Sequence, residues 1–330
     1  MRKIYLFTFM MLLLAHLKGQ AQQITLHVER AGTLPDMIDK SRFPYITDLK
    51  LTGELNGTDI RLIRTLAQEN LQILDLSEAR IVEGGASYYS NYRTSNDIIG
   101  SYMFYIPYNT VNPCAISKIN LPNSVTGIKE GAFKNCTRLT DINIPNSVKS
   151  IGYEAFRDCT SLTNINIPNS VTSIGDGAFS SCTSLTDINI PNSVTSIEWN
   201  TFILCTSLTN INIPNSVTSI GEQAFYNCDN LKSVYMNAST PPSVGDQAFH
   251  NISDLTIYIP RGSYTAYWLS YWGNYNLVEY DPTDIQGVTT SAHNGAEKYF
   301  SIDGRPLPGP CKGVNIIQDT DGKTRKAWIP

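Results

Sequence analysis

The chain has 330 residues, of which 42% are hydrophobic, and its formal net charge at pH 7 is −4. This length and composition supply enough apolar side chains for a sizeable core. Lysine and arginine do not cluster anywhere in this mildly acidic sequence, so it lacks the basic surface that nucleic acids or anionic lipids require. We therefore expect neither as a partner.

Residues 1–21 have the pattern of a secretory signal. Arg2 and Lys3 precede an apolar run from Ile4 to Ala15, and Gly19-Gln20-Ala21 has the small-x-small form of a cleavage site. The apolar run is too short to span a bilayer comfortably, and a retained anchor is the alternative interpretation. Removal of this segment, with Arg2, Lys3 and Lys18, leaves 22 basic against 29 acidic residues, a net charge of −7. We expect an exported protein at the cell surface or secreted, with the periplasm as the alternative, and no membrane insertion after signal removal.

Residues 22–114 are predicted to form an N-terminal cap with divergent repeat units. Gln23–Glu29 alternates like a strand, and Thr33–Ile38 has the composition of a short helix. Two leucine-rich segments begin at Ile46 and Leu71, and Thr58 between them is placed to cap an amphipathic helix. We expect this region to cover the first open end of a stack of repeats.

An insertion rich in glycine, serine and tyrosine runs from Glu83 to Asp97 and contains Tyr88, Tyr89 and Tyr92. The repeat register returns directly afterwards, so we expect a loop on a continuing stack and not a domain linker. Exposed tyrosines on a loop can bind a partner. Packing against the flank of the repeats is the interpretation that we favour for them.

Residues 115–260 repeat one sequence of 23 residues. The first leucine of each unit marks the step: Leu139, Leu162, Leu185, Leu208 and Leu231. So short a repeat is typical of a solenoid, because one unit cannot bury its apolar face alone and must stack on its neighbours. The apolar positions of one unit are Leu162, Ile165, Ile167, Val171, Ile174, Ala178, Phe179 and Cys182.

Each unit is predicted to contain two short strands and a helical turn. Leu-x-x-Ile-x-Ile reads as a strand that pairs in parallel with the next rung at roughly 4.8 Å, and Pro168 ends it because proline offers no N–H. Val-Thr-Ser-Ile offers a second strand, and Gly-x-x-Ala-Phe a tight turn. The glycine of this turn, Gly175 for example, suggests a positive φ, although Lys129 and Glu198 replace it in two units.

These units resemble the 23-residue leucine-rich repeats of the BspA-like bacterial surface proteins, with a consensus close to L-x-x-I-x-I-P-x-S-V-x-x-I-G-x-x-A-F-x-x-C. The resemblance implies a β-rich solenoid, a right-handed coil with parallel strands and short helical turns. It also implies an adhesin that binds host extracellular proteins or other microbes. The repeat pattern by itself indicates only stacking.

Five of the seven cysteines occupy one repeat position: Cys136, Cys159, Cys182, Cys205 and Cys228. The next unit has Ile252 there, so we interpret the position as an interior apolar site with buried thiols. A disulfide or soft-metal role is the alternative, but a spacing of 23 residues matches no zinc pattern. Cys114 and Cys311 stand outside the register, and whether either forms a disulfide is left open.

The C-terminal part changes composition twice. Residues 261–281 are predicted to be an aromatic cap, with an amphipathic helix from Ser263 to Trp272 over the last coil, and a sugar-binding platform is the alternative. Residues 282–330 are predicted to be a linker and a small β module of three strands with Asp-Gly turns. The module resembles one found on many exported proteins of the same bacterial groups. Sorting or surface retention is one interpretation of its role, and stability is the other.

Catalytic chemistry is not indicated. After signal removal the histidines are His27, His250 and His293, in three different regions, and no phosphate loop, metal motif or nucleophile elbow is present. Asp141 and Asp187 alternate with asparagines along the stack, which is not expected of a catalytic pair. We predict no enzyme activity, no cofactor and no metal.

The candidate binding residues are therefore surface residues of three kinds. An asparagine column on the strand face ends in a tyrosine: Asn143, Asn166, Asn189, Asn212 and Tyr235. One unit has apolar residues where the previous unit is polar, namely Trp199, Ile203 and Leu204, and local repacking is the alternative there. The third group is Tyr88, Tyr89 and Tyr92.

The sequence thus predicts a non-catalytic surface protein that adheres to host or microbial macromolecules. Its partner is expected to be an extracellular protein or glycan of unknown identity. A glycan-recognition protein and a structural spacer are the alternatives. Amide groups in register are also expected to bond to each other between rungs.

Overall fold

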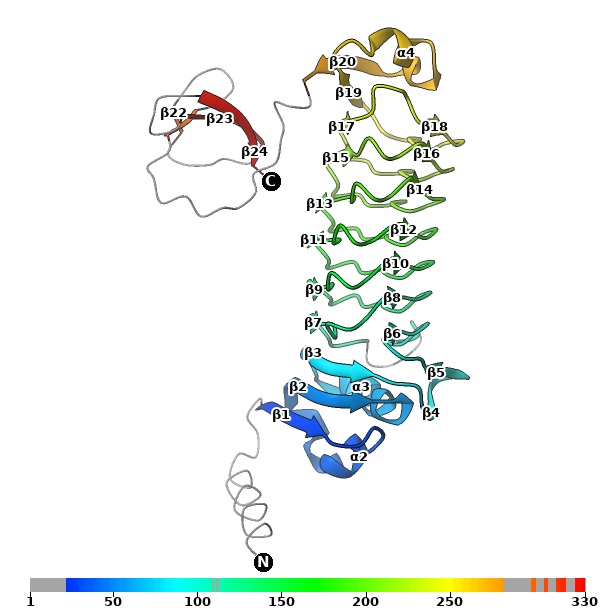
Figure 1. Ribbon diagram of the computed structural model, residues 1–330, viewed down its shortest axis with the longest axis vertical. Coiled ribbons are helices and arrows are strands. Elements are labelled where there is room, and N and C mark those ends of the chain that lie inside the picture. The colour runs from blue at the N-terminus through cyan, green and yellow to red at the C-terminus, as the bar shows by residue number, and fades with distance from the viewer. Residues whose placement is uncertain are drawn as a thin grey trace, which may run out of the picture.

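The computed structural model describes residues 22–108, 110 and 113–281, and four strands between residues 298 and 329. The predicted signal, most of the linker and Cys311 lie outside the described residues. From residue 22 to residue 281 the chain forms an elongated stack of coils with a cap at each end (Figure 1).

The N-terminal end is a parallel sheet covered by helices. Strands β1 (Gln22–Val28), β2 (Ile46–Leu55) and β3 (Ile73–Ile81) pair in chain order, and β3 continues into the first regular coils. Helices α2 (Leu34–Met37), η1 (Lys40–Tyr45) and α3 (Gly57–Glu69) connect them. The predicted first strand, short helix and amphipathic helix are therefore present.

The predicted cap of α3 was wrong by two residues. Asn56 is the N-cap: its side chain accepts a hydrogen bond from the Thr58 N–H at 2.9 Å, and the Asp59 carboxylate accepts one from the Asn56 N–H at 2.9 Å. This reciprocal capping box satisfies two backbone donors, the N–H groups of Asn56 and Thr58. A cap at Thr58 would leave both groups without these partners. The Thr58 hydroxyl instead accepts a bond from the Ala86 N–H.

The tyrosine-rich insertion is an antiparallel hairpin and not an irregular loop. Its strands are β4 (Gly84–Tyr89) and β5 (Tyr92–Thr94). Gly57 at the start of α3 lies against β4 so closely that a Cβ there would come within 1.9 Å of the Ala86 carbonyl oxygen. The hairpin thus packs onto the N-terminal helix.

The regular coils stack through two columns of short parallel strands (Figure 1). The first column is β7 (Lys118–Asn120), β9 (Asp141–Asn143), β11 (Asn164–Ile165), β13 (Asp187–Ile188), β15 (Asn210–Ile213), β17 (Ser233–Met236) and β19 (Thr256–Pro260). The second is β6 (Ile98–Ile99), β8 (Gly127–Ile128), β10 (Ser150–Ile151), β12 (Ser173–Ile174), β14 (Ser196–Ile197), β16 (Ser219–Ile220) and β18 (Ser243–Val244). Ser150 pairs with Ser173, one 23-residue step later, as the repeat predicts.

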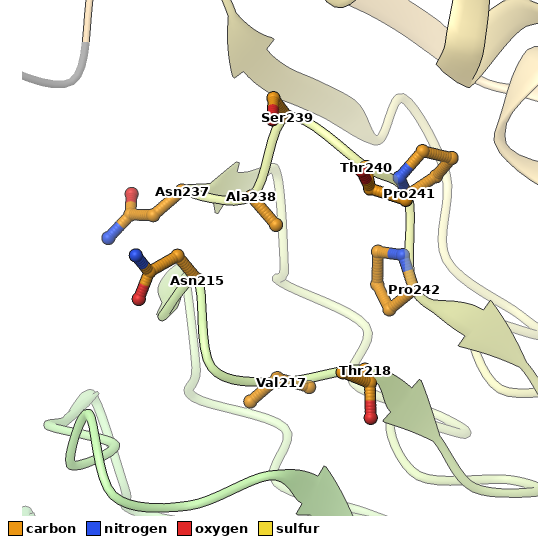
Figure 2. Close-up of a pocket in the computed structure, with 9 residues that line it drawn as sticks. All are labelled: Asn215, Val217, Thr218, Asn237, Ala238, Ser239, Thr240, Pro241 and Pro242. Carbon is orange, nitrogen blue, oxygen red and sulfur yellow. The ribbon is translucent and has the colours of Figure 1, made fainter.

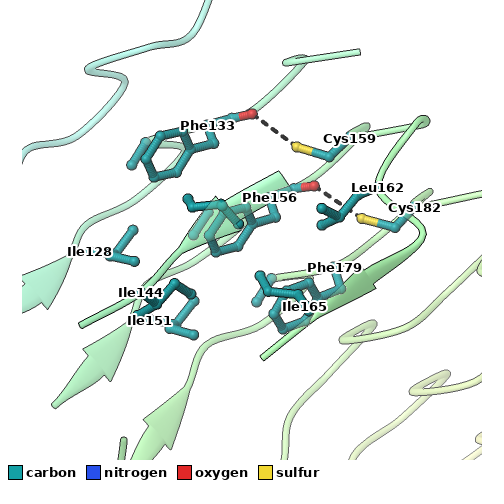
Figure 3. Close-up of a cluster of buried hydrophobic side chains, with 14 of the residues drawn as sticks. Ile128, Phe133, Ile144, Ile151, Phe156, Cys159, Leu162, Ile165, Phe179 and Cys182 are labelled. Atoms are coloured by element: carbon teal, nitrogen blue, oxygen red, sulfur yellow. Dashed lines mark hydrogen bonds between the residues drawn. The ribbon is translucent and has the colours of Figure 1, made fainter. Parts of the chain in front are cut away.

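A stack of phenylalanines occupies the interior of the coils (Figure 3). Successive rings lie 5.0–5.7 Å apart between centroids, with interplanar angles of 1° to 17°. The stack contains Phe104, Phe133, Phe156, Phe179, Phe202, Phe225 and Phe249, all buried. The predicted β-rich leucine-rich-repeat solenoid with one shared apolar interior is confirmed.

The cysteine ladder lies beside these rings. Cys159 and Cys182 each point their Sγ at the phenylalanine carbonyl oxygen of the preceding coil, at 3.2 Å in both cases (Figure 3). Burial raises the pKa of Cys182 and of Cys228 to about 12, so both remain thiols at neutral pH. The five repeat cysteines are all free and buried, as the apolar-site interpretation predicts, and Cys114 outside the register is also free and buried.

The turn glycines have a different role from the one predicted. Gly152, Gly175 and Gly221 do not adopt a positive φ; a Cβ on Gly175 would lie 2.7 Å from the Tyr153 backbone nitrogen of the preceding coil. Close approach of two backbones therefore favours glycine here. The left-handed residue comes two positions later, at Glu154 and Gly177 for example.

The C-terminal cap consists of two short helices and an edge strand. In place of one helix from Ser263 to Trp272, α4 (Tyr264–Trp268) is followed by η2 (Tyr271–Asn274), and β20 (Asn276–Tyr280) then pairs with β19. Tyr267 and Trp272 are fully buried, and the Trp272 ring lies 5.5 Å from the last core ring, Phe249. These side chains cover the end of the stack, as a lid should.

The C-terminal segment contains an antiparallel sheet. It has four strands where three were predicted: β21 (Lys298–Phe300), β22 (Pro306–Leu307), β23 (Gly313–Gln318) and β24 (Thr324–Ile329), in the order β22-β21-β23-β24. The extra strand is the two-residue β22, which contains a proline and has no alternating pattern to reveal it.

Candidate binding surfaces

Many repeated polar residues hold one coil to the next. The Ser170 hydroxyl donates to the Val148 carbonyl oxygen at 2.7 Å, and the Thr186 hydroxyl donates to that of Thr163 at 3.1 Å. Because these bonds satisfy backbone acceptors of the preceding coil, such hydroxyls are needed for stacking. The binding candidates must be sought among the remaining surface residues.

The strand-face asparagines have no such role. Asn143, Asn166, Asn189 and Asn212 are all exposed, and within the described chain no amide hydrogen bond joins one of them to the next. The expected ladder between rungs is therefore not formed. Tyr235 ends the column half-buried, with its ring stacked on Tyr258 at 4.6 Å between centroids. This face offers a row of amides to a ligand.

A cluster of charged residues lies on the helical turns of two neighbouring coils. We call it the charged flank, and it consists of Lys134, Glu154, Arg157 and Asp158. Glu154 is buried and accepts hydrogen bonds from Lys134 Nζ at 2.5 Å and from Arg157. Burial alone would raise the pKa of Glu154, but the hydrogen bonds and charges of Lys134 and Arg157 outweigh it and lower that pKa. The charged flank satisfies its own charges across two coils.

Two coils later, the positions of Arg157 and Asp158 hold the apolar residues Ile203 and Leu204. We call Trp199, Ile203 and Leu204 the apolar flank. Trp199 is 45% exposed and Leu204 38%, and Ile203 is half-buried. The three residues lie on one turn of one coil, and none of them is in the core.

Leu204 also has an unfavourable backbone conformation. Its φ is +61°, and the equivalent residues of the neighbouring coils, Ser181 and Asn227, adopt the same left-handed conformation. Asparagine and aspartate tolerate this region, whereas it is costly for a bulky side chain. A leucine at this position therefore combines backbone strain with an exposed apolar side chain.

The tyrosines of the hairpin are mostly packed. Tyr88 is buried, its hydroxyl donates to the Ser101 carbonyl oxygen at 2.8 Å, and burial raises its pKa to about 12. Tyr88 is therefore packed against its neighbours, in agreement with the packing interpretation that we favour for these tyrosines. Tyr89 contacts several neighbouring rings, and the Arg64 guanidinium lies 4.7 Å from its ring centroid. Tyr92 remains accessible at 38% exposure.

A pocket that the sequence analysis did not propose lies between the last coils, next to the C-terminal cap (Figure 2). Its volume is about 430 Å³. It is lined by Asn215, Val217, Thr218, Asn237, Ala238, Ser239, Thr240, Pro241 and Pro242. The sequence signal is a 24-residue step from Ser219 to Ser243, which breaks the 23-residue repeat, and the Pro-Pro pair within it.

We searched the part of the chain that the structure describes for metal-ligand clusters and for membrane-spanning helices. No cluster of three or more histidine, cysteine or acidic side chains there is arranged to hold a metal ion. The helices among these residues are all too short or too polar to cross a bilayer.

Comparison with known proteins concerns mainly the repeat region. The model of the BspA type leucine rich repeat region matches residues 97–232 and 197–280, with six copies. No curated protein matches the chain. A solved leucine-rich repeat protein of T. pallidum is 34% identical, with a TM-score of 0.41, and the match covers 43% of this chain and 65% of that one.

Two further solved structures are more distant. A leucine-rich repeat protein from Bacteroides ovatus ATCC 8483 is 24% identical (TM-score 0.32), and the match covers 58% of this chain and 66% of that one. A leucine rich cell surface protein from Faecalibacterium prausnitzii A2-165 is 20% identical (TM-score 0.36), with 68% and 79% covered. The chain spans slightly less than two thirds of the T. pallidum and B. ovatus structures.

The two family matches together cover residues 97–280, which is more than half of the chain. Their limits enclose the coils that carry the phenylalanine stack and the cysteine ladder. The protein therefore belongs to the family of BspA-type leucine-rich repeat proteins.

Proposed function

We propose that this protein is a non-catalytic, exported binding protein that adheres to an extracellular polypeptide through its apolar flank. The observation that carries the proposal is the exposure of Trp199 and Leu204 at positions that are polar in the preceding coil. Membership of the BspA-type family and the signal-like N-terminal segment agree with this role.

The energetics of the apolar flank favour a bound partner. A left-handed conformation costs an ordinary residue about 1–2 kcal/mol, and Leu204 adopts it while 38% of its surface remains exposed. A partner that covers Leu204 and Trp199 would recover hydrophobic free energy of about 25 cal/mol per Å² of apolar surface removed from water. Tryptophan is also among the residues most often found at the centre of binding interfaces.

The asparagine column is proposed to extend this contact. Its exposed amides can donate hydrogen bonds to the backbone of an extended polypeptide and accept hydrogen bonds from it. Each such hydrogen bond contributes about 0.5–1.5 kcal/mol net. Since these amides do not bond to each other, they need not break an existing bond to engage a ligand. The strand face would thus add many weak contacts to the few strong ones of the apolar flank.

The test is a binding screen of the chain from Gln22 onward against immobilised extracellular matrix proteins. Trp199→Ala combined with Leu204→Ser should weaken saturable binding at least tenfold and leave the melting temperature nearly unchanged. The matched control is Asp176→Ala with Ser181→Ala, at the same positions one coil earlier. Equal weakening by the control, or a large loss of stability in the Trp199 and Leu204 variant, would contradict the proposal.

Glycan recognition is the second candidate function. It is favoured by the exposed aromatic pair on the C-terminal cap, where Tyr264 and Trp268 are stacked with centroids 6.1 Å apart and an interplanar angle of 11°. Flat exposed rings can stack on the apolar face of a sugar. Binding on a glycan array without binding to any protein would favour this candidate, and silence in both screens would favour a structural spacer.

A further inference from the structure

The pocket beside the C-terminal cap exists because one coil departs from the repeat. In the regular coils the corner after the first strand is closed by a serine that bonds to the preceding coil, as Ser216 does to the Val194 carbonyl oxygen at 2.7 Å. One extra residue between Ser219 and Ser243 makes the next corner wider. The segment Asn237–Pro242 then stands away from Val217 and leaves an open space (Figure 2).

The wall of this pocket is held rigidly from behind. The Tyr267 hydroxyl donates to the Ala238 carbonyl oxygen at 2.7 Å, and the Trp272 indole N–H donates to that of Pro242 at 2.9 Å. The Tyr280 hydroxyl donates to Asn237 Oδ1 at 2.7 Å. Tyr267 and Trp272 are themselves fully buried in the cap, so a ligand would meet a preformed wall and would not have to order it.

The lining is uncharged and rich in hydrogen-bonding groups. Asn215 makes no side-chain hydrogen bond among the described residues, and the Asn237 amide nitrogen has none either. Ser239 and Thr240, which also line the pocket, are exposed residues. An ionic ligand would lose hydration here without gaining a counter-charge, which disfavours it. A neutral ligand with many hydroxyl groups needs no counter-charge and can bond to unpaired amides and hydroxyls of this kind.

The apolar part of the lining fits the same class of ligand. Pro241 and Ala238 are half-buried and line the pocket beside the polar residues, whereas Val217 and Pro242 are buried behind them (Figure 2). A sugar ring has hydroxyls around its edge and C–H groups on its faces, so it matches a lining of this mixed kind. The volume of about 430 Å³ lies within the range of small-molecule sites. We propose that this pocket binds one residue of a neutral glycan.

This inference rests on the second candidate function and is independent of the apolar flank. The test begins with a microarray of neutral, sialylated and sulfated glycans, followed by calorimetric titration with the strongest neutral oligosaccharide. Asn215→Ala should weaken its binding at least tenfold because the amide contacts are lost. The control Asn192→Ala removes the equivalent exposed asparagine one coil earlier, outside the pocket, and should bind as the unmodified chain does.

A second variant fills the space. Ala238→Phe places a ring where the sugar would lie and should abolish neutral-glycan binding, with the melting temperature showing that the coil is intact. Binding of charged glycans only, no glycan binding, or equal effects of Asn215→Ala and Asn192→Ala would overturn the inference. The Trp199→Ala, Leu204→Ser variant should still bind the oligosaccharide, so the failure of one proposal is distinguishable from the failure of the other.

Discussion

The charged flank and the apolar flank share two positions of the repeat and have opposite chemistry there: Arg157 and Asp158 correspond to Ile203 and Leu204, two coils later. Asp158 and Leu204 adopt nearly identical left-handed conformations, with φ of +60° and +61°, although one belongs to an ion-pair cluster and the other is an exposed hydrophobic residue. The backbone of the coil therefore does not depend on what this position carries. The shared phenylalanines, cysteines and hydroxyls determine the stack, and the turn side is free to vary for other purposes.

If the interior is the same beneath both flanks, removal of one buried phenylalanine ring should lower the free energy of unfolding by the same amount in both places. The Phe156 ring lies beneath the charged flank and the Phe202 ring beneath the apolar flank, and each ring is fully buried between two others. The two variants to compare are Phe156→Ala and Phe202→Ala. We expect each change to reduce the free energy of unfolding by about 3–5 kcal/mol, measured by urea denaturation followed by circular dichroism. The exposed Tyr153→Ala should cost far less. Costs that differ by more than about 2 kcal/mol between the two phenylalanines would show that the flanks are part of the core.

The charged flank should contribute stability that the apolar flank does not. Glu154→Gln leaves Lys134 and Arg157 without their shared carboxylate, and we expect a loss of about 1–3 kcal/mol in the free energy of unfolding at pH 7. Glu222→Gln is the control, since this exposed carboxylate lies on the turn side next to the apolar flank. An equal loss in both variants would mean that Glu154 has no special role.

The same variant has a predicted pH dependence. The pKa of Glu154 is lower in the folded chain than its ordinary value of 4.5, so its stabilisation is complete above that value and is lost as the pH falls through the folded pKa. The stability difference between the unmodified chain and Glu154→Gln should therefore shrink on acidification below about pH 4.5. A difference that stays constant from pH 7 to pH 3 would contradict the lowered pKa.

The sequence predicted the interior well and the exterior poorly, for a physical reason. Leu162, Phe179 and Cys182 recur because every coil must fill the same space, and a recurring requirement leaves a periodic signal. Features that occur once leave no such signal. The cap at Asn56 was misplaced because Thr58 is also a good capping residue, and only the carboxylate geometry of Asp59 decides between them.

The candidate sites show the same limit. That Trp199 and Leu204 differ from the preceding unit was visible in the sequence, whereas their exposure depends on which way the turn points them. Tyr88 and Tyr92 were indistinguishable by composition, yet the hairpin buries one and exposes the other. The pocket requires the cap residues Tyr267 and Trp272 to meet a loop some thirty residues earlier in the chain, which no local pattern encodes.

The smallest expected effect is also the one that separates binding from folding most clearly. Leu204→Asn replaces a residue that is strained at φ of +61° with one that tolerates this conformation, so the unbound chain should gain about 0.5–1 kcal/mol in its free energy of unfolding. Ser181→Leu, at the same position one coil earlier, should lose a similar amount. Both values can be read from urea denaturation midpoints, with adhesion measured on the same samples. A leucine kept for folding would make Leu204→Asn destabilising, whereas a leucine kept for a partner makes the variant more stable and less adhesive.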